Sequence, residues 1–236
     1  MKRIVLKISG EALSGDTGVG INYNKVKDIA NEIKDLHDSG DIELSIVVGA
    51  GNICRGREAI ATGMNRTNAD YMGMLATVIN AMALQGALEG LGKEAVVMTA
   101  LSMPIVTQFY TRRDCLEQLS KGKIVIFGGG IANPFFSTDT TAALRSCELD
   151  IDLILMAKNG VDGVYDRDPR KDKSAKRYTK MTHQEILDKN LAVMDLTAAT
   201  LCSQNNVDIY VFDMNEKGNI SKAAFDFSFG TLITNK

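Results

Sequence analysis

Short runs of β-branched and other apolar residues alternate along this chain with stretches that have helical periodicity. In the first such stretch Val26, Ile29, Ile33 and Leu36 recur every three or four residues, which indicates one apolar face of a helix. Strands that alternate with helices pair in parallel, and a parallel sheet is covered on both faces. We therefore predict a three-layer α/β/α sandwich with a central, mostly parallel sheet. The predicted strands cover residues 3–8, 44–48, 95–98, 123–127, 152–155 and 207–212, and further helices cover residues 139–149, 182–188 and 195–205.

The length of 236 residues allows one large domain or two small ones. Three prolines are spread along the chain, and no linker-like or low-complexity segment divides it. We therefore expect a single domain over residues 1–236.

The charge balance argues against polyanionic partners. Lys and Arg number 27 against 29 Asp and Glu, which gives a net charge of −2, so neither nucleic acid nor an anionic membrane is attracted in general. The longest uncharged stretch, residues 71–88, includes Asn80 and Gln85 and is too polar for a bilayer span. It predicts instead a helix that is apolar nearly all round and is buried in the core or against another subunit. Without an export signal, a cytoplasmic location is expected.

The sequence has few of the residues that hydrolytic active sites require. The four cysteines lie far apart without companion histidines, which favours buried, reduced thiols over a zinc site or disulfides. Of the two histidines, His183 falls in Thr182-His-Gln-Glu185, a capping-box pattern. Hydrolases built on Ser-His-Asp or Cys-His are therefore close to excluded.

Glycine clusters follow four of the predicted strands, and in open α/β sheets ligands bind beyond the carboxyl ends of the strands. Several clusters at one edge favour a phosphate-rich ligand held by backbone N–H groups. The P-loop and dinucleotide fingerprints are both absent, so the phosphates are held in another way. The four clusters are Ser9-Gly10, Gly49-Ala-Gly-Asn52, Gly128-Gly-Gly130 and Asn159-Gly160.

Three charged residues are candidates for ligand binding, each with an ordinary alternative. Lys7 lies on the first strand, where it either is solvated at a sheet edge or places a point charge on a phosphate. Arg55 follows a glycine turn and is either a surface residue or a bidentate phosphate clamp. Asp70 opens the apolar helix and is either an ordinary first-turn acid or a partner for ribose hydroxyls.

Two loops suit a nucleotide. The segment Asn133-Pro-Phe-Phe-Ser-Thr-Asp139 combines aromatic faces, hydroxyls and a helix start, which fits a base and its phosphate but also an ordinary βα loop. In the segment Val161-Asp-Gly-Val-Tyr-Asp-Arg-Asp-Pro169, Tyr165 could flank adenine and Asp168 could bond a nucleotide hydroxyl. Taken alone, the second segment is a turn.

In this order, these motifs resemble the bacterial uridylate kinases of the amino-acid-kinase superfamily, over nearly the whole chain. The matching blocks are Lys7-Ile-Ser-Gly-Glu-Ala12, Gly51-Asn-Ile-Cys-Arg-Gly56, Ala69-Asp-Tyr-Met-Gly-Met-Leu-Ala-Thr77, Asn133-Pro-Phe-Phe-Ser-Thr-Asp139, Met156-Ala-Lys-Asn159, Val161-Asp-Gly-Val-Tyr-Asp-Arg-Asp-Pro169, Val193-Met-Asp-Leu196 and Val211-Phe-Asp-Met-Asn215.

The resemblance implies conversion of UMP and ATP to UDP and ADP, dependent on Mg²⁺, in pyrimidine nucleotide synthesis. It also implies a Rossmann-like sheet unrelated to P-loop kinases and a homo-hexamer built from dimers. Mg²⁺ would be bound mainly through ATP, without an assigned protein ligand. The implied ATP-binding residues are Lys7, Ile8, Ser9, Gly10, Gly51, Arg55, Lys158, Asn159, Tyr165 and Asp168, and the implied UMP-binding residues are Gly49, Ala50, Asp70, Asn133, Pro134, Phe135, Phe136, Ser137 and Thr138. The implied catalytic residues are Lys7, Arg55 and Asp139.

The sequence departs from the family pattern at three places. Ala50 interrupts a glycine run. The backbone contact made by that run survives the change only if Ala50 keeps a negative φ. Ile131-Ala132 replaces Thr-Gly and removes a hydroxyl from the UMP side, and Cys54 replaces an aromatic residue. The segment Gly15-Asp-Thr-Gly-Val-Gly20 matches the region that the family associates with GTP activation, but we do not carry that regulation over.

The predicted chemistry needs no histidine, because a phosphate monoester oxygen is already ionised and phosphoryl transfer depends on alignment and charge neutralisation. One alternative is a sister kinase that phosphorylates a carboxylate, carbamate or amino acid, which would need a more charged acceptor site. A non-catalytic nucleotide sensor is a second alternative, although it would not need both Lys7 and Arg55. The failed dinucleotide fingerprint disfavours a dehydrogenase.

Overall fold

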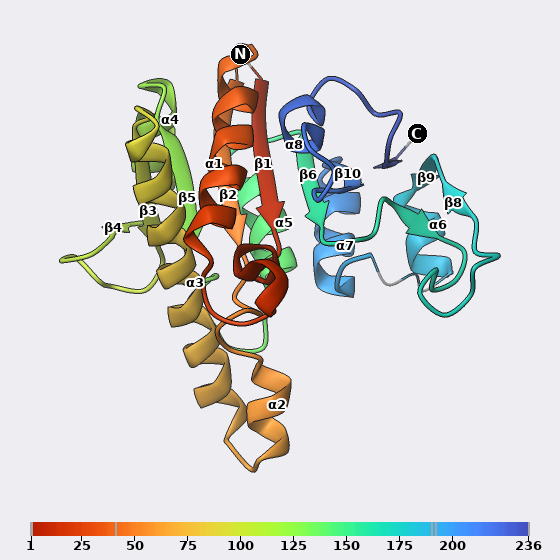
Figure 1. The fold of residues 1–236 in the computed structure, drawn as a ribbon, viewed down its shortest axis with the longest axis horizontal. Coiled ribbons are helices and arrows are strands. Elements are labelled where there is room, and N and C mark those ends of the chain that lie inside the picture. The colour runs from red at the N-terminus through yellow and green to blue at the C-terminus, as the bar shows by residue number, and fades with distance from the viewer. Residues whose placement is uncertain (1, 41, 190, 192, 236) are drawn as a thin grey trace.

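The computed structural model describes residues 2–40, 42–189, 191 and 193–235. Within these residues, nine strands form one sheet in the order β4-β3-β5-β2-β1-β6-β10-β11-β9 (Figure 1). Those strands are β1 (Lys2–Ile8), β2 (Ile42–Val48), β3 (Ala95–Thr99), β4 (Gln108–Phe109), β5 (Ile124–Gly128), β6 (Leu153–Lys158), β9 (Lys180–Thr182), β10 (Asp208–Asp213) and β11 (Thr231–Thr234). The short strands β7 (Val164–Tyr165) and β8 (Arg177–Tyr178) pair separately.

The helical segments connect these strands. They are the 3₁₀ segment η1 (Gly10–Thr17) and the helices α1 (Tyr23–Asp38), α2 (Gly56–Ala61), α3 (Arg66–Gly90), α4 (Arg112–Ser120), α5 (Thr138–Glu148), α6 (His183–Asp188), α7 (Leu196–Gln204) and α8 (Asn219–Lys222). The six predicted strands and the predicted helices are all present, with bounds that differ by a few residues.

The sheet is mostly parallel, as predicted. β1 pairs in parallel with β2 on one side and with β6 on the other. In the described part of the sheet, the antiparallel pair is β10 with β11. The two faces of the sheet follow the alternation of side chains along each strand.

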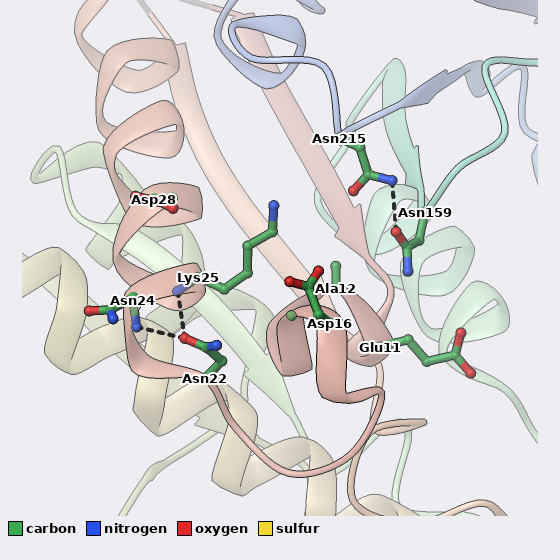
Figure 2. A pocket seen from close by; sticks show the side chains of 10 residues that line it. Glu11, Ala12, Asp16, Asn22, Asn24, Lys25, Asp28, Asn159 and Asn215 are labelled. Carbon is green, nitrogen blue, oxygen red and sulfur yellow. Dashed lines mark hydrogen bonds between the residues drawn. The ribbon is translucent and has the colours of Figure 1, made fainter.

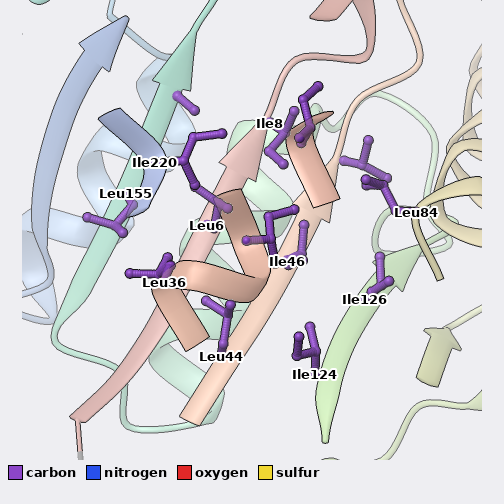
Figure 3. Close-up of a cluster of buried hydrophobic side chains, with 14 of the residues drawn as sticks. Leu6, Ile8, Leu36, Leu44, Ile46, Leu84, Ile124, Ile126, Leu155 and Ile220 are labelled. Atoms are coloured by element: carbon purple, nitrogen blue, oxygen red, sulfur yellow. The ribbon is translucent and has the colours of Figure 1, made fainter. Parts of the chain in front are cut away.

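One face carries Leu6 and Ile8 against α1, α3 and α8, as Figure 3 shows for part of this cluster. The opposite face carries Val5 and Met156 against α4, α5 and α7. Two buried layers of apolar side chains therefore hold helices on both sides of the sheet, and the predicted three-layer α/β/α fold is confirmed.

The helix α3 is buried only in part within one chain, so of the two predicted settings the core accounts for one side of the helix. Ala81, Leu84 and Leu88 are buried, but the apolar stripe from Met72 to Met82 is 43–50% exposed. Its first half extends with α2 beyond the carboxyl edge of the sheet (Figure 1). Among the described helices, α3 alone is long and apolar enough to span a membrane by length and composition, a test that core helices also pass.

The cysteines differ in part from the prediction of burial. All four are free thiols. Cys115 and Cys202 are buried, whereas Cys54 and Cys147 are half-buried. Burial raises the pKa of the Cys115 and Cys202 thiols to about 12, which keeps both protonated at neutral pH.

Candidate functional site

The four glycine clusters lie together at the carboxyl edge of the sheet, at the ends of β1, β2, β5 and β6. From β1 the chain continues to β2 on one side and later returns to β6 on the other. This reversal is the topological switch point at which open α/β sheets bind ligands. Two of the loops touch, because a Cβ on Gly10 would lie 2.5 Å from the carbonyl oxygen of Gly49.

Lys7 occupies the centre of this edge. Because β1 lies between β2 and β6, the alternative of a solvated edge-strand lysine is wrong. The residue is 9% exposed, and its Nζ lies 2.7 Å from Oδ1 of Asp139, the second residue of α5. The sequence alternation thus places Lys7 on the α5 side of the sheet, where a carboxylate offsets the cost of its burial.

Lys158, at the end of β6, completes a largely buried cluster of charges. Burial lowers the pKa of Lys158, as does the Lys7 charge, while Asp139 opposes this effect. Burial alone would raise the pKa of Asp139, but the Lys7 and Lys158 charges outweigh it and hold the pKa below its usual range. Lys158 also donates to the carbonyl oxygen of Val193 at 2.6 Å. The cluster therefore presents positive charge to the loops at the switch point.

The start of α5 is fixed by local sequence. Ser137 caps the helix by accepting hydrogen bonds from the N–H groups of Asp139 and Thr140, so the helix start predicted in this segment is confirmed. Its hydroxyl donates to Asp195, the N-cap of α7, and the hydroxyl of Thr140 does the same at 3.0 Å. Thr138 is the first residue of α5, and its Oγ1 lies 3.7 Å from a Cβ built on Gly49. The loop of residues 131–137 that leads into α5 therefore lies near the end of β2.

Asp70 has a different setting from the one predicted. The helix α3 begins at Arg66 after the Asn65 cap, so Asp70 lies in the second turn and the explanation as a first-turn acid is wrong. Its Oδ2 accepts a hydrogen bond of 2.8 Å from the N–H of Phe135, and Arg66 lies 3.5 Å away. Asp70 thereby joins α3 to the loop that carries Asn133 and Pro134.

The loop of residues 131–137 is strained, and its aromatic rings are exposed. Ala132 and Phe135 have φ of +62° and +74°, which costs a residue with a side chain of the order of 1 kcal/mol each. The rings of Phe135 and Phe136 are exposed, and the Arg66 guanidinium lies 4.7 Å from the Phe135 ring centroid. Ala50, in contrast, has no positive φ, so the condition for keeping its backbone contact is met.

Arg55 lies just before α2 and is 47% exposed by its side chain. It is held by Glu11 at 3.1 Å, by Glu58 at 3.5 Å and by a hydrogen bond to the carbonyl oxygen of Gly51. The guanidinium therefore lies beside the residues that follow β1 and β2, on the solvent side of the loops.

On the other side of the switch point is a cavity of about 570 Å³. Lys158, Tyr165 and Asp168 line it, so three of the residues implied for ATP binding come together. The Tyr165 hydroxyl donates to Asp162 at 2.6 Å, and that bond raises the pKa of Tyr165.

Asn159 lines a neighbouring cavity of about 460 Å³ that also contains Glu11, Lys25 and Asn215 (Figure 2). Its Oδ1 accepts a hydrogen bond of 2.8 Å from Asn215, which comes from the loop after β10. Ile8, Ser9 and Gly10, which are also implied for ATP binding, lie at the junction of β1 and η1, directly after Lys7 in the chain.

Three polar residues at this edge were missed by the functional reasoning. Thr77 and Asn80 on α3 are buried and bond to the loops after β5 and β2, and Asn52 pairs with Asn80. A threonine and an asparagine within an otherwise apolar helix are the signal that could have found them, because buried polar groups need partners.

No group of three or more His, Cys, Asp or Glu residues suitable for a metal ion occurs in the described ranges. Asp139 is nevertheless a hard oxygen donor at the site, and Mg²⁺ in nucleotide enzymes takes one or two carboxylates together with substrate phosphates. The residues present therefore fit a magnesium ion that arrives with its nucleotide.

The fold and the site define a phosphotransferase of the amino acid kinase family, to which this chain belongs, since the model of that family matches residues 2–213. Within the family, the chain is similar over its whole length to UMP kinases. The crystal structure of UMP kinase from Bacillus anthracis has a TM-score of 0.95 and 41% identity, covering 100% of this chain and 96% of that one. UMP kinase from Ureaplasma parvum has a TM-score of 0.94 and 37% identity, covering 99% and 98%. Uridylate kinase from Archaeoglobus fulgidus is more distant, with a TM-score of 0.73, 29% identity and coverage of 99% and 100%.

Proposed function

We propose that this protein is a UMP kinase, which transfers the γ-phosphoryl group of ATP to UMP and gives UDP and ADP for pyrimidine nucleotide synthesis. The observation that carries the proposal is the buried Lys7–Asp139–Lys158 cluster at the switch point of a chain that is 41% identical to a UMP kinase over its whole length. We also propose that residues 1–236 work as one domain.

On the donor side, the loop after β1 and the two lysines face the ATP phosphates, because backbone N–H groups and buried cations are what a polyphosphate needs. The cavity beyond β6 takes the adenosine. The proposed donor residues are Lys7, Ile8, Ser9, Gly10, Gly51, Arg55, Lys158, Asn159, Tyr165 and Asp168.

On the acceptor side, the loop before α5 holds uracil against its aromatic rings, and the start of α5 meets the UMP phosphate. Asp70 accepts hydrogen bonds from the ribose hydroxyls, close to the N–H of Phe135 that it already binds. The proposed acceptor residues are Gly49, Ala50, Asp70, Asn133, Pro134, Phe135, Phe136, Ser137 and Thr138.

The proposed mechanism is alignment with charge neutralisation. The UMP phosphate is ionised near neutral pH, so its oxygen attacks the γ-phosphorus without a general base. Lys7 holds positive charge beside the transferred group, and Arg55 bridges the donor and acceptor phosphates. Asp139 holds the Lys7 ammonium in place, as their 2.7 Å contact supports.

Magnesium, when bound with ATP, neutralises charge on the phosphates. Asp139 is the residue that would hold it, alone or through water, since it is the carboxylate paired with Lys7 at the phosphate edge. Lys7 and Lys158 keep this carboxylate ionised, as the lowered pKa of Asp139 indicates.

The exposed apolar stripe on α3 supports self-association. Met72, Leu75, Ile79 and Met82 are each more than 40% exposed on one helix, and contiguous apolar surface of this kind marks an interface. We propose that it joins two copies and that the assembly is a homo-hexamer built from such dimers. A cytoplasmic location suits an enzyme that uses these nucleotides.

The test is turnover by the purified protein with Mg-ATP and, separately, UMP, CMP, dUMP, AMP and GMP, with direct detection of the diphosphate. Turnover confined to UMP supports the proposal. Turnover of none of them refutes it; binding of ATP with phosphorylation of another acceptor would then indicate a sister kinase. Binding of ATP with no acceptor at all would indicate a sensor.

A further inference from the structure

The helix α3 turns two buried polar side chains toward the glycine loops. Thr77 and Asn80 are 3% and 0% exposed, stand one turn apart, and are surrounded by apolar neighbours on the same helix. Residues three apart on a helix share a face. Burial of two polar side chains costs free energy unless both are hydrogen-bonded.

Thr77 holds the loop after β5. Its hydroxyl donates to the carbonyl oxygen of Met74 at 2.6 Å and accepts a hydrogen bond of 2.7 Å from the N–H of Gly129. Gly129 has φ of +74°, and a Cβ there would lie 2.2 Å from Oγ1 of Thr99. The glycine is thus hydrogen-bonded to the Thr77 hydroxyl and packed closely against that of Thr99, two residues before the loop of residues 131–137.

Asn80 holds the loop after β2. Its Nδ2 donates to the carbonyl oxygen of Gly49 at 2.8 Å and to Oδ1 of Asn52 at 2.7 Å, and Asn52 returns a hydrogen bond to Asn80. Asn52 also donates to the carbonyl oxygen of Gly20 at 2.7 Å. A single buried amide pair therefore ties α3 to two loops at the phosphate edge.

We propose that Thr77 and Asn80 are positioning residues, which set the two glycine loops relative to each other so that donor and acceptor phosphates meet in line. Neither side chain needs to touch substrate. Thr77 affects only the UMP side, because it holds Gly129. Asn80 affects both substrates, because it holds Gly49 and, next to it, Gly51. This proposal rests on the proposed UMP kinase function, since it concerns the same site.

The test compares Thr77→Val, which keeps the shape but cannot accept the Gly129 hydrogen bond, with Thr77→Ser, which restores the hydroxyl. Misplacement of a binding loop by about 1 Å costs up to a hundredfold. We expect Thr77→Val to raise the KM for UMP by about ten- to one-hundredfold while the KM for ATP changes less than about threefold. Thr77→Ser should recover most of the loss.

Ser146→Ala is the matched control, because the buried Ser146 hydroxyl donates to the carbonyl oxygen of Ala142 in its own helix and, within the described residues, holds no loop. It should lower thermal stability without changing either KM. Asn80→Leu is the second variant, and it should lower kcat/KM for both nucleotides. Equal changes in the two KM values for Thr77→Val, or failure of Thr77→Ser to recover them, would overturn the positioning role.

A measurement without turnover separates this proposal from the proposed function. Amide hydrogen exchange of residues 128–138 should accelerate at least about tenfold in Thr77→Val and return toward wild type in Thr77→Ser. If wild-type protein does not phosphorylate UMP, the proposed function fails, and the exchange result still decides whether Thr77 holds the loop. Unchanged exchange in Thr77→Val refutes the positioning role, whatever the substrate.

Discussion

Replacement of Lys7 by methionine is expected to separate the structural and the catalytic parts of the charge cluster. At 2.7 Å from Asp139, and with an effective dielectric constant of about 20, the gross attraction is about 6 kcal/mol. Desolvation of the two groups offsets part of this, and truncation of one partner of a buried pair costs about 3–5 kcal/mol. Lys158 remains beside Asp139, so we expect the lower end, about 3 kcal/mol, in the free energy of unfolding.

The companion variants are Asp139→Asn and the double variant. In the double variant no buried carboxylate is left without its partner. Urea denaturation of the wild type, the two single variants and the double variant should therefore give a coupling energy of about 2 kcal/mol between the two positions. Both Lys7→Met proteins should lose at least about a thousandfold in kcat, because the charge beside the transferred phosphoryl group is gone in each. Additive unfolding energies would refute the ion pair as a source of stability. A kcat within about threefold of wild type would refute the catalytic role of Lys7.

Three further predictions follow from other residues. Arg55→Ala should lower kcat by orders of magnitude. It should leave the urea midpoint unchanged, because the Arg55 side chain is half exposed and salt bridges at such sites stabilise little. A barely altered turnover would show that Arg55 bridges no phosphates. Asp70→Asn should raise the KM for UMP and reduce discrimination against dUMP, which competition between the two nucleotides measures, and unchanged discrimination would remove Asp70 from the ribose site. Burial lowers the pKa of His183 below 6.5, so the unfolded chain binds a proton first as the pH falls, and stability should decline below about pH 6.5. Urea denaturation between pH 7.5 and 5.5 should show a smaller decline in His183→Gln, and an equal decline would point to other groups.

The sequence was sufficient for the elements with a strong periodic signal. The β-branched runs and the apolar face of α1 predict strands and a helix because burial on one or both faces imposes the pattern. Short elements such as β4, β7 and η1 lack a pattern of their own and form where neighbouring structure fixes them, so they were missed. The beginning of α3 was also missed, since the polar residues before Asp70 carry no apolar period and project beyond the sheet.

For the site, the residue types predicted which residues take part but not how they are arranged in space. Lys7 could be assigned a role but not a partner, because the distance to Asp139 depends on how α5 crosses the sheet 130 residues later in the chain. In the same way, the contact between Asp70 and the N–H of Phe135 joins segments that nothing local relates. Long-range contacts of this kind are products of the fold, and a single sequence contains no direct signal for them.

The helix α3 departs from the amphipathic rule. A helix that packs only on a core needs one apolar face, yet α3 is apolar on its exposed side and places its buried polar groups, Thr77 and Asn80, against the loops at the carboxyl edge. Exposed apolar area favours contact with another subunit, whereas the buried hydroxyl and amide fix backbone groups at the site. Both sets of contacts are made by one helix. A subunit that docks on Ile79 therefore contacts the same helix that positions Gly49 and Gly129. Self-association and loop geometry are therefore expected to be coupled through α3.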